Sequence, residues 1–326
     1  MLSFVLRRLL QAVLVLLTIS FASFMIQGKL GDPVRQMVGT SVSVEQREAL
    51  RDELGLNDPT LVQYGRFLGQ ALQGDLGTSY YYKESTLTVI ANRLPATLEL
   101  SFCALVLVIV MATPLGVFAA INPKNWLSRS ILLFSTLGLS IPIFIVAVFL
   151  MYFFAIEWRL LPSFGRGDTT QVLGLWQSGL FNKDGLMHLL LPSVSLAFVM
   201  TPIFIRLIRA EMIDVLQSDY IRFAWSKGIS APRIYFIHAL KNTMLPVITV
   251  GGIQTGTLIA YTILTESIFQ WPGMGFLFMD AVTRVDAPLI SAYLIVVGLI
   301  FVVTNTLVDV VYGLVNPRVR IPGYSA

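Results

Sequence analysis

Residues 219–246 read DYIRFAWSKGISAPRIYFIHALKNTMLP, a polar and basic stretch between two long apolar runs. Its two helix-forming pieces, Ser218–Lys227 and Pro232–Asn242, are separated by a Gly-Ile-Ser break at Gly228. A strongly apolar protein needs a reason to carry so much polar helix in one internal loop, and contact with another protein is the best one. We therefore predict a docking surface here. A solvated basic loop that faces anionic lipid is the alternative.

The composition of the whole chain is that of a membrane protein. Of its 326 residues, 55% are hydrophobic and 13% are charged, whereas soluble domains carry about 25% charged residues. Six stretches of 20 to 27 residues contain no Asp, Glu, Lys or Arg: 9–28, 100–123, 130–156, 185–205, 242–265 and 287–308. A helix of about 20 apolar residues crosses the hydrocarbon core, so six transmembrane helices are predicted. A large soluble helical protein is disfavoured, because its helices would each keep a polar face.

The basic residues of the short loops gather on one side of this topology. With the N-terminus inside, that side holds Arg7, Arg8, Lys124, Arg129, Arg206, Arg209, Arg222, Lys227, Arg233, Lys241, Arg318 and Arg320, opposed by Glu211, Asp214, Asp219 and Asp309. Short cytoplasmic loops are enriched in Lys and Arg, so both termini are predicted to be cytoplasmic. The first apolar run is longer than that of a cleaved leader and is expected to remain as a span. The net charge of +4 therefore reports membrane orientation and not binding to nucleic acid.

The predicted outer side contains segments with structure of their own. Residues 29–99 hold an amphipathic helix in VSVEQREALRDELGL (42–56), an Asn-Asp-Pro turn, a second helix near Val62–Leu72 and a break at Gly74, which together predict a small folded cap. In 266–286, a Trp-Pro-Gly turn separates two apolar pieces that are too short to span, as in a re-entrant or interfacial hairpin. An ordinary aromatic loop at the membrane surface is the alternative for this segment. Residues 157–184 are interpreted as a Gly-rich polar loop.

Motifs for catalysis, metal binding or phosphate binding are missing from the sequence. It has no G-x-x-x-x-G-K-[ST] loop, no H-E-x-x-H or cysteine cluster and no G-x-S-x-G elbow, and Cys103 is its single cysteine. Glu99, Glu266 and Asp309 lie only at the ends of predicted spans, whereas proton- or sodium-driven transporters keep a carboxylate near the midplane. A partner is therefore expected to supply energy. A secondary transporter or channel, and a membrane-embedded enzyme, stay open as disfavoured alternatives.

A series of short segments runs along nearly the whole chain in a characteristic order: Gly31-Asp32-Pro33, ELGLNDP (53–59), Gln63-Tyr64, Gln73-Gly74-Asp75-Leu76-Gly77, RLPATLEL (93–100), Pro114-Leu115-Gly116-Val117, Ser140-Ile141-Pro142, DYIRFAWSKG (219–228), HALKNTMLPVITV (238–250), Trp271-Pro272-Gly273-Met274-Gly275 and NPRVR (316–320). In order and spacing they resemble the inner-membrane permease subunit of dipeptide and oligopeptide ABC importers, the B-type subunit of the peptide/nickel branch. Residues 219–228 resemble its cytoplasmic coupling loop. Arg222, Phe223 and Ala224 stand where the general pattern has Glu-Ala-Ala and the peptide branch commonly has Arg-Thr-Ala, so Phe223 and Trp225 are bulkier than usual.

The resemblance implies an all-α polytopic membrane protein with the type I ABC importer permease fold, six transmembrane helices and a folded periplasmic segment between helices 1 and 2. Residues 1–28 would form the first transmembrane helix, 29–96 the periplasmic segment, and 97–326 the core transmembrane domain of five helices, with the coupling loop at 210–243. It also implies a non-catalytic permease of the bacterial inner membrane that forms half of a pathway for di- or oligopeptides. Related permeases of this branch carry nickel chelates, glutathione or sugars, so the solute stays open.

The same resemblance implies the partners. These are a second homologous permease subunit, two cytoplasmic ATPase subunits that bind ATP and Mg, and a periplasmic or lipid-anchored substrate-binding protein. The chain itself would hold no cofactor or metal.

The coupling role is expected of Asp219, Tyr220, Arg222, Phe223, Ala224, Trp225, Lys227, Gly228, His238, Lys241 and Asn242. The aromatic members of this set and Ala224 would enter a groove on the ATPase, and the basic members would form a polar rim. Gly228 permits the tight break. Closure of the ATPase pair would then move the loop rigidly and rock the spans between inward- and outward-facing states.

Uncharged polar residues inside the spans are the candidates for the translocation path: Gln254, Thr255, Thr257, Asn305 and Thr306. Small and hydroxyl residues in spans also serve helix packing, and both interpretations stay open. A path without charge suits solutes bound largely through their backbone, such as peptides. Trp271, Pro272 and Gly273 are expected to form an outer gate or a docking hairpin.

Overall fold

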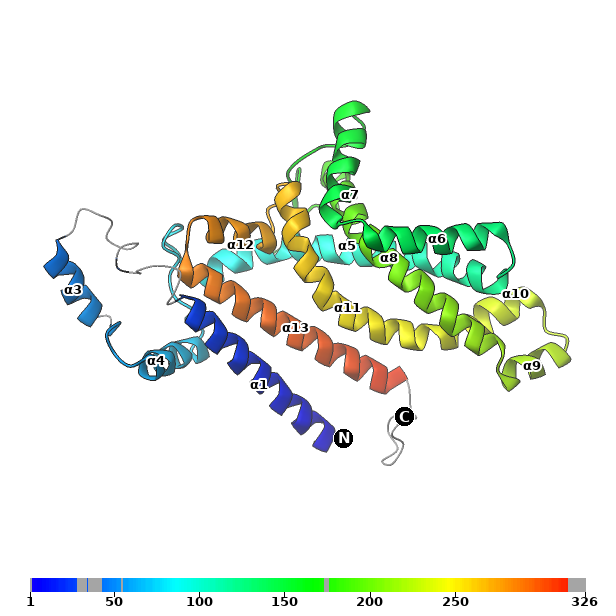
Figure 1. The fold of residues 1–326 in the computed structure, drawn as a ribbon, viewed down its shortest axis with the longest axis horizontal. Helices are drawn as coiled ribbons and strands as arrows, with labels where there is room; N and C mark the ends of the chain where they lie inside the picture. The colour runs from blue at the N-terminus through cyan, green and yellow to red at the C-terminus, as the bar shows by residue number, and fades with distance from the viewer. Residues whose placement is uncertain (1, 28–33, 35–42, 54, 173–175, 316–326) are drawn as a thin grey trace. The chain divides into compact units, whose positions relative to one another are not determined.

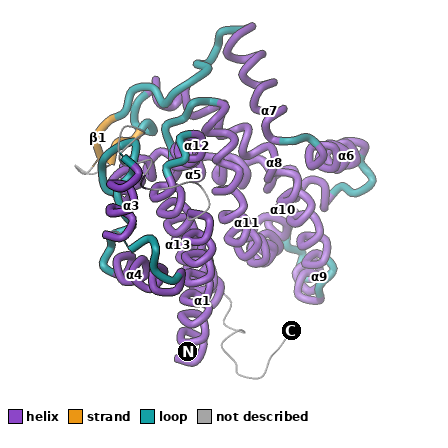
Figure 2. Tube along the Cα trace, turned by 60° about the vertical axis from the view of Figure 1, so that its left-hand side comes forward, coloured by secondary structure: helices purple, strands orange, loops and turns teal. Residues whose placement is uncertain are grey.

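The computed structural model describes residues 2–27, 34, 43–53, 55–172 and 176–315 (Figure 1). Helices dominate, and the described strands form a single antiparallel pair, β1 (Thr170–Val172) with β2 (Trp176–Ser178), in the predicted 157–184 loop (Figure 2). The chain divides into two compact units. Unit 1 is Met1–Pro95 with Gly273–Val303, and unit 2 is Ala96–Pro272 with Thr304–Ala326.

Five helical runs in the described part of the chain are long and apolar enough to cross a membrane. They lie in α1 (Leu2–Gln27), α5 (Thr86–Ile121), α8 (Lys183–Leu216), the run through α10 (Ala231–Arg233), η2 (Ile234–Ala239) and α11 (Leu240–Ile268), and α13 (Ala287–Val315). A helix pair takes the place of the remaining predicted span, 130–156. The pair is α6 (Trp126–Ser140) and α7 (Ile143–Leu150), the latter continued by the π-helical turn η1 (Met151–Glu157). The all-α, multi-span prediction is confirmed, with the third span broken.

The break in the third span lies at Ile141 and Pro142, where the two helices bend by 105°. Proline has no N–H to donate to the preceding turn, and its ring pushes the residue before it out of the helical region. Ile141 accordingly has φ −90° and ψ 119°, an extended conformation. The apolar run predicted as a span at 130–156 is therefore folded as two helices that meet at this bend.

In unit 1, both helices expected within 29–99 are present, as α3 (Val44–Glu53) and α4 (Thr60–Leu72). Tyr64 fixes α4 to α1, because its ring contacts Phe21 and Phe24 at centroid distances of 5.2 and 5.6 Å and its hydroxyl lies 2.7 Å from that of Ser20. The segment after α1 thus includes a helix packed on that span. The matching segments at 31–33 and 316–320 lie outside the described residues.

Asp286, directly before α13, ties the loop ahead of α5 into unit 1. Its buried carboxylate accepts hydrogen bonds from the Ser79 hydroxyl at 2.5 Å and from the backbone N–H groups of Tyr80 and Tyr81, both at 3.2 Å. Burial, with the nearby Asp286 carboxylate, raises the pKa of Tyr80 to about 12, so its phenol stays neutral. The loop and the start of α13 therefore form one rigid element of unit 1.

The core of unit 2 is built on a four-residue repeat along α5. A row of fully buried residues recurs at positions that share one helix face: Ala96, Leu100, Ala104, Val108 and Ala112. One turn further, a Cβ atom on Gly116 would lie only 2.9 Å from the Ile208 side chain of α8. Small residues let helices approach closely in a membrane, so α5 and α8 pack tightly here.

The polar stretch at 219–246 is only partly folded as predicted. Its first piece is the separate helix α9 (Asp219–Ser226), but the second piece is continuous with the following span through α10, η2 and α11. The expected end near Asn242 is wrong, because no glycine or proline stands between Arg233 and Leu245 to end the helix. The stretch therefore consists of one separate helix, α9, followed by the N-terminal extension of a long one.

Candidate functional site

Helix α9 has a buried side and an exposed side. Ile221 and Ala224 are 0% and 8% exposed and pack into the core of unit 2, whereas Tyr220, Phe223 and Trp225 keep 44%, 60% and 44% of their surface exposed. Three exposed aromatic side chains on an eight-residue helix are the surface that a docking element needs. Ala224 is buried against the core, so the expectation that it enters a groove on the partner is wrong. Its methyl group instead seats α9 on the core.

The break after α9 requires a glycine. Gly228 has φ +72°, a conformation that other residues adopt only at a cost of about 1–2 kcal/mol. Its N–H donates to the carbonyl of Trp225 at 2.9 Å, and the N–H of Ile229 donates to that of Ala224 at 3.3 Å, which ends the helix. No atom lies within 4 Å of a Cβ built on Gly228, so the requirement is one of backbone conformation alone.

Side chains from η2 and α11 brace α9. Asn242 Nδ2 donates to the Tyr220 hydroxyl at 2.7 Å, and the rings of Trp225 and Tyr235 meet edge to face at 6.2 Å. His238 is half-buried on η2, and its Nε2 has no hydrogen-bond partner among the described residues. These contacts tie α9 to the start of the long helical run through η2 and α11, within the same unit.

The charged residues of the coupling set are exposed around this aromatic surface. Arg222 and Asp219 form a solvent-exposed ion pair at 3.4 Å, and the Lys227 ammonium lies 4.5 Å from the ring centre of Phe223. Lys241 is exposed at the start of α11. The structure thus provides an apolar centre with a charged rim, the usual anatomy of a protein interface.

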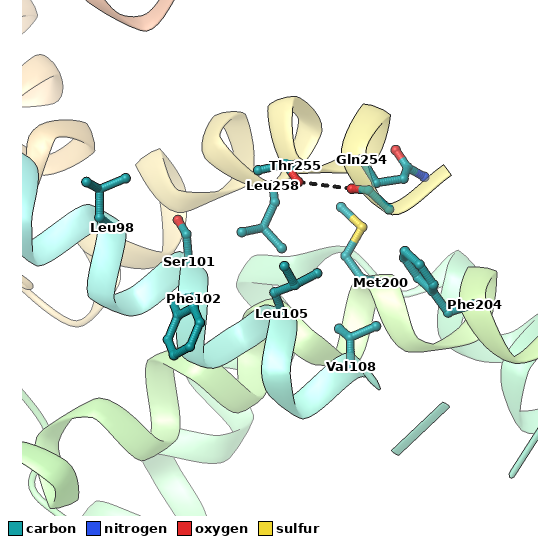
Figure 3. Close-up of a pocket in the computed structure, with 11 residues that line it drawn as sticks. Leu98, Ser101, Phe102, Leu105, Val108, Met200, Phe204, Gln254, Thr255 and Leu258 are labelled. Carbon is teal, nitrogen blue, oxygen red and sulfur yellow. Dashed lines mark hydrogen bonds between the residues drawn. The ribbon is translucent and has the colours of Figure 1, made fainter. Parts of the chain in front are cut away.

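A cavity of about 200 Å³ lies in unit 2 between α5, α8 and α11 (Figure 3). Eleven residues line it: Leu98, Ser101, Phe102, Leu105, Val108, Met200, Phe204, Gly251, Gln254, Thr255 and Leu258. Of the predicted path residues, Gln254 and Thr255 are among them. Thr257, Asn305 and Thr306 are not brought to this cavity.

The two neighbouring glycines of α11, Gly251 and Gly252, face different surroundings. A Cβ atom on Gly252 would lie 2.1 Å from Val308 of α13, so this glycine permits close helix packing. A Cβ atom on Gly251 would meet Phe204 at an ordinary 3.6 Å on the edge of the cavity. Gly252 thus serves helix packing and Gly251 borders the cavity, while the translocation path itself stays a prediction.

A buried ion pair joins α5 to the segment that contains β1 and β2. Arg166 donates to Glu99 Oε2 at 2.6 Å and to the carbonyl of Gln177 at 2.6 Å, and the two charged side chains are 10% and 2% exposed. Trp176 Nε1 donates to Glu99 Oε1 at 3.1 Å, and the N–H of Gly179 to Oε2 at 3.4 Å. Glu99 thus fixes both ends of β2, through Trp176 and Gly179, and also the loop that contains Arg166.

Sequence reasoning did not identify this network. Glu99 was placed at the end of a span, but α5 begins at Thr86, so Glu99 lies well inside the helix. Glu266, placed in the same way, is fully buried and accepts a hydrogen bond from the Thr97 hydroxyl at 2.7 Å. A pattern that could have indicated the network is an acid beside an apolar run with an arginine in the next outer loop, since buried charges need partners.

The Trp-Pro-Gly turn is anchored and not free. Trp271 is fully buried in unit 2, its Nε1 donates to the carbonyl of Ala96 at 3.0 Å, and the Arg166 guanidinium lies 5.9 Å from its ring centre. Gly273 is also buried, and Pro272 is half-buried. The turn leads from α11 into α12 (Met274–Thr283), so the two apolar pieces are the end of a span and a short helix. Trp271 and Gly273 therefore form no exposed docking surface, and an outer gate at this turn stays a prediction.

Within the described residues, no group of three or more His, Cys, Asp or Glu side chains is placed to hold a metal ion.

Comparisons with known proteins match two family models to this chain, over residues 1–101 and 112–321. The sequence model described as "Binding-protein-dependent transport system inner membrane component" matches residues 112–321. The model of the N-terminal part of such membrane components matches residues 1–101.

Three similar proteins are also permease proteins of transport systems. The chain is 36% identical to the dipeptide transport system permease protein DppB of Alkalihalophilus pseudofirmus, over 98% of this chain and 100% of that one. It is 35% identical to DppB of Escherichia coli and 33% identical to the glutathione transport system permease protein GsiC of Shigella flexneri, each over 98% of this chain and 99% of the other. Among solved structures, a chain of the MetNI methionine ABC transporter in an inward-facing conformation superposes with a TM-score of 0.55 at 15% identity, over 71% of this chain and 97% of that one. The type I importer fold is thereby confirmed.

Proposed function

Because the chain belongs to the binding-protein-dependent transport system inner membrane component family, we propose that it is the permease subunit of an ATP-driven importer of short peptides. Family membership makes it a non-catalytic membrane subunit of a transport system. The peptide substrate is supported by the relatives, two of which are named for dipeptides and one for glutathione, itself a peptide. The observation that carries the proposal is the exposed aromatic side of α9, braced against the long helix that follows it.

The proposed mechanism couples ATPase closure to the spans through α9. Phe223 is the centre of the contact, Tyr220 and Trp225 flank it, and Arg222 and Lys227 form the rim. The ATPase subunits hold ATP and Mg, and a groove on their surface accepts the helix. Tyr220 and Trp225 have bracing partners, so movement of α9 draws η2 and α11 with it.

The proposed assembly contains two such permeases, two ATPase subunits and a periplasmic or lipid-anchored binding protein. The chain lies in the bacterial inner membrane with both termini in the cytoplasm, as the distribution of Lys and Arg favours. Residues 1–28 form the first span, 29–96 the periplasmic segment and 97–326 the core domain, with the coupling loop at 210–243. Helices α4 and α12 offer exposed surface to the binding protein on the outer side.

Purification tests the assembly. From native membranes, a tagged chain is expected to bring down ATPase subunits and a second permease, and the complex is expected to hydrolyse ATP. The chain purified alone is expected to show no hydrolysis above the protein-free control, because it has no phosphate-binding loop. ATP hydrolysis by the isolated chain, or a transport-competent preparation free of ATPase subunits, would overturn the proposal.

The orientation is tested with two single cysteines in a Cys103→Ser background. Thr283 on α12 and Ser226 on α9 are both exposed. A membrane-impermeant thiol reagent added from outside is expected to label Thr283→Cys in intact cells, and Ser226→Cys only after the membrane is permeabilised. The reverse pattern would place α9 outside and invert the topology.

A further inference from the structure

The cavity between α5, α8 and α11 has no charged group in its lining. Its walls are formed by Leu, Phe, Val and Met side chains, with the polar groups of Ser101, Gln254 and Thr255 between them (Figure 3). A charged side chain that entered would lose its hydration without gaining a counter-charge, which is strongly unfavourable. The cavity therefore favours uncharged, apolar occupants.

The Ser101 hydroxyl, like that of Ser193, has no hydrogen-bond partner in the described structure, unlike several other hydroxyls of this unit. The hydroxyls of Ser195, Thr201 and Thr255 each donate to the carbonyl four residues earlier, at 2.7 to 2.9 Å, as is common in membrane helices. Ser101 is 92% buried, since 8% of it is exposed, and its Oγ has no hydrogen-bond partner in the described structure. Figure 3 shows its hydroxyl on the side of α5 that faces α11. A buried polar group without a partner is available to a ligand that supplies one.

Gln254 offers a second polar contact at one end of the cavity. Its half-buried amide makes no hydrogen bond to any described residue, whereas the hydroxyl of Thr255 is already engaged by Gly251. An amide can both donate and accept, and it matches the N–H and C=O groups of a peptide bond. The polar groups at this cavity therefore suit an amide that lies beside an apolar group.

The size of the cavity limits its occupant to one side chain. Sites for whole drug-sized ligands measure roughly 300–1,000 Å³, and this cavity measures about 200 Å³. On the edge of the cavity, Gly251 leaves room for one further methyl group at ordinary contact distance from Phe204.

We propose that this cavity is a subsite for one uncharged, apolar side chain of the transported peptide, with Ser101 and Gln254 as partners for the adjoining amide. The subsite makes the permease itself selective for peptides with leucine-like side chains, in addition to any selection by the binding protein. This inference rests on the proposed function.

The test uses the complete transporter in proteoliposomes, with one binding protein throughout. Uptake of labelled glycyl-leucine and glycyl-glycine is measured side by side. Gly251→Ala is expected to lower the ratio of glycyl-leucine to glycyl-glycine uptake about tenfold, the effect of one methyl group in an apolar pocket. Ser101→Ala is expected to lower glycyl-leucine uptake about fivefold through the loss of one hydrogen bond.

Ser193→Ala is the matched control. Its hydroxyl is also buried and unpartnered on α8, but Ser193 does not line the cavity, so the wild-type ratio is expected. A second readout uses a dipeptide whose leucine carries a photoreactive diazirine. The label is expected on cavity residues such as Phe102 and Met200, and unlabelled glycyl-leucine is expected to compete with it.

Three outcomes would contradict the subsite. Normal uptake of both dipeptides with an unchanged ratio in Gly251→Ala and Ser101→Ala would overturn it while the importer function stands. Labelling of the cavity that glycyl-leucine does not reduce would assign the cavity to a lipid chain. A complex that hydrolyses ATP and imports neither dipeptide would remove the peptide function, and the subsite with it.

Discussion

Arg166→Met is expected to destabilise the protein by about 3–5 kcal/mol, because it leaves Glu99 as a buried charge without its partner. Arg166 supplies the 2.6 Å contact to Glu99 and also holds the Gln177 carbonyl. The remaining donors to Glu99, Trp176 Nε1 and the N–H of Gly179, carry no charge. Thermal denaturation of the purified protein in detergent, followed by size-exclusion chromatography, measures the loss.

Two variants make this prediction specific. Arg222→Met removes a pair whose side chains are 72% and 98% exposed, and the expected change in stability is below about 1 kcal/mol. The double variant Glu99→Gln with Arg166→Met is expected to be more stable than Arg166→Met alone, since no isolated charge remains. Equal losses for the single and double variants would show that the ion pair does not hold this part of unit 2.

Phe223→Asp is expected to weaken ATPase binding about 30-fold, as the loss of a central aromatic contact of about 2 kcal/mol implies. Phe223 has the largest exposed fraction of the three aromatic residues on α9, at 60%. The fold is therefore expected to survive, and insertion into the membrane with it. The amount of ATPase that co-purifies with the tagged chain measures the effect.

The control is Phe181→Asp, which changes a phenylalanine that is 72% exposed, against 60% for Phe223, in the turn before α8 and far from α9 in sequence. Normal co-purification is expected for it. Ala224→Glu is unsuitable, because Ala224 is buried and the charge would disrupt α9 itself. Undiminished ATPase binding by Phe223→Asp would show that α9 is not the docking element.

The spans could be predicted from the sequence because length and absence of charge are local properties of a chain segment. Helices α3 and α4 could also be predicted, because an amphipathic pattern and flanking turn residues are likewise local properties of the sequence. The bend at Pro142 was missed, since a charge-free run of 27 residues has the same composition whether the helix continues or breaks. The continuation of α10 into α11 was missed because polar residues at 238–242 were interpreted as an end, although no helix-breaking residue follows Arg233 before Leu245.

The candidate site was predicted less completely, because its organisation depends on contacts between distant residues. The partners Glu99 and Arg166 are 67 positions apart, and no local pattern pairs them. Which side of α9 is buried, the side that includes Ala224, depends on the core against which the helix packs. The position of Trp271 also depends on a distant residue. Its turn motif suggested an outer hairpin, whereas in the structure the side chain is buried and hydrogen-bonded to the carbonyl of Ala96.

The most direct test of the central claim is ATP-dependent uptake of a labelled dipeptide by proteoliposomes that contain the complete transporter. ATP is enclosed in the vesicles, and the binding protein with its dipeptide is added outside. We expect accumulation only when ATP, the binding protein and this chain are all present, and a reduction of about 30-fold when the chain carries Phe223→Asp. Accumulation driven by an ion gradient without ATP, or wild-type uptake with Phe223→Asp, would contradict a permease coupled to its ATPases through α9.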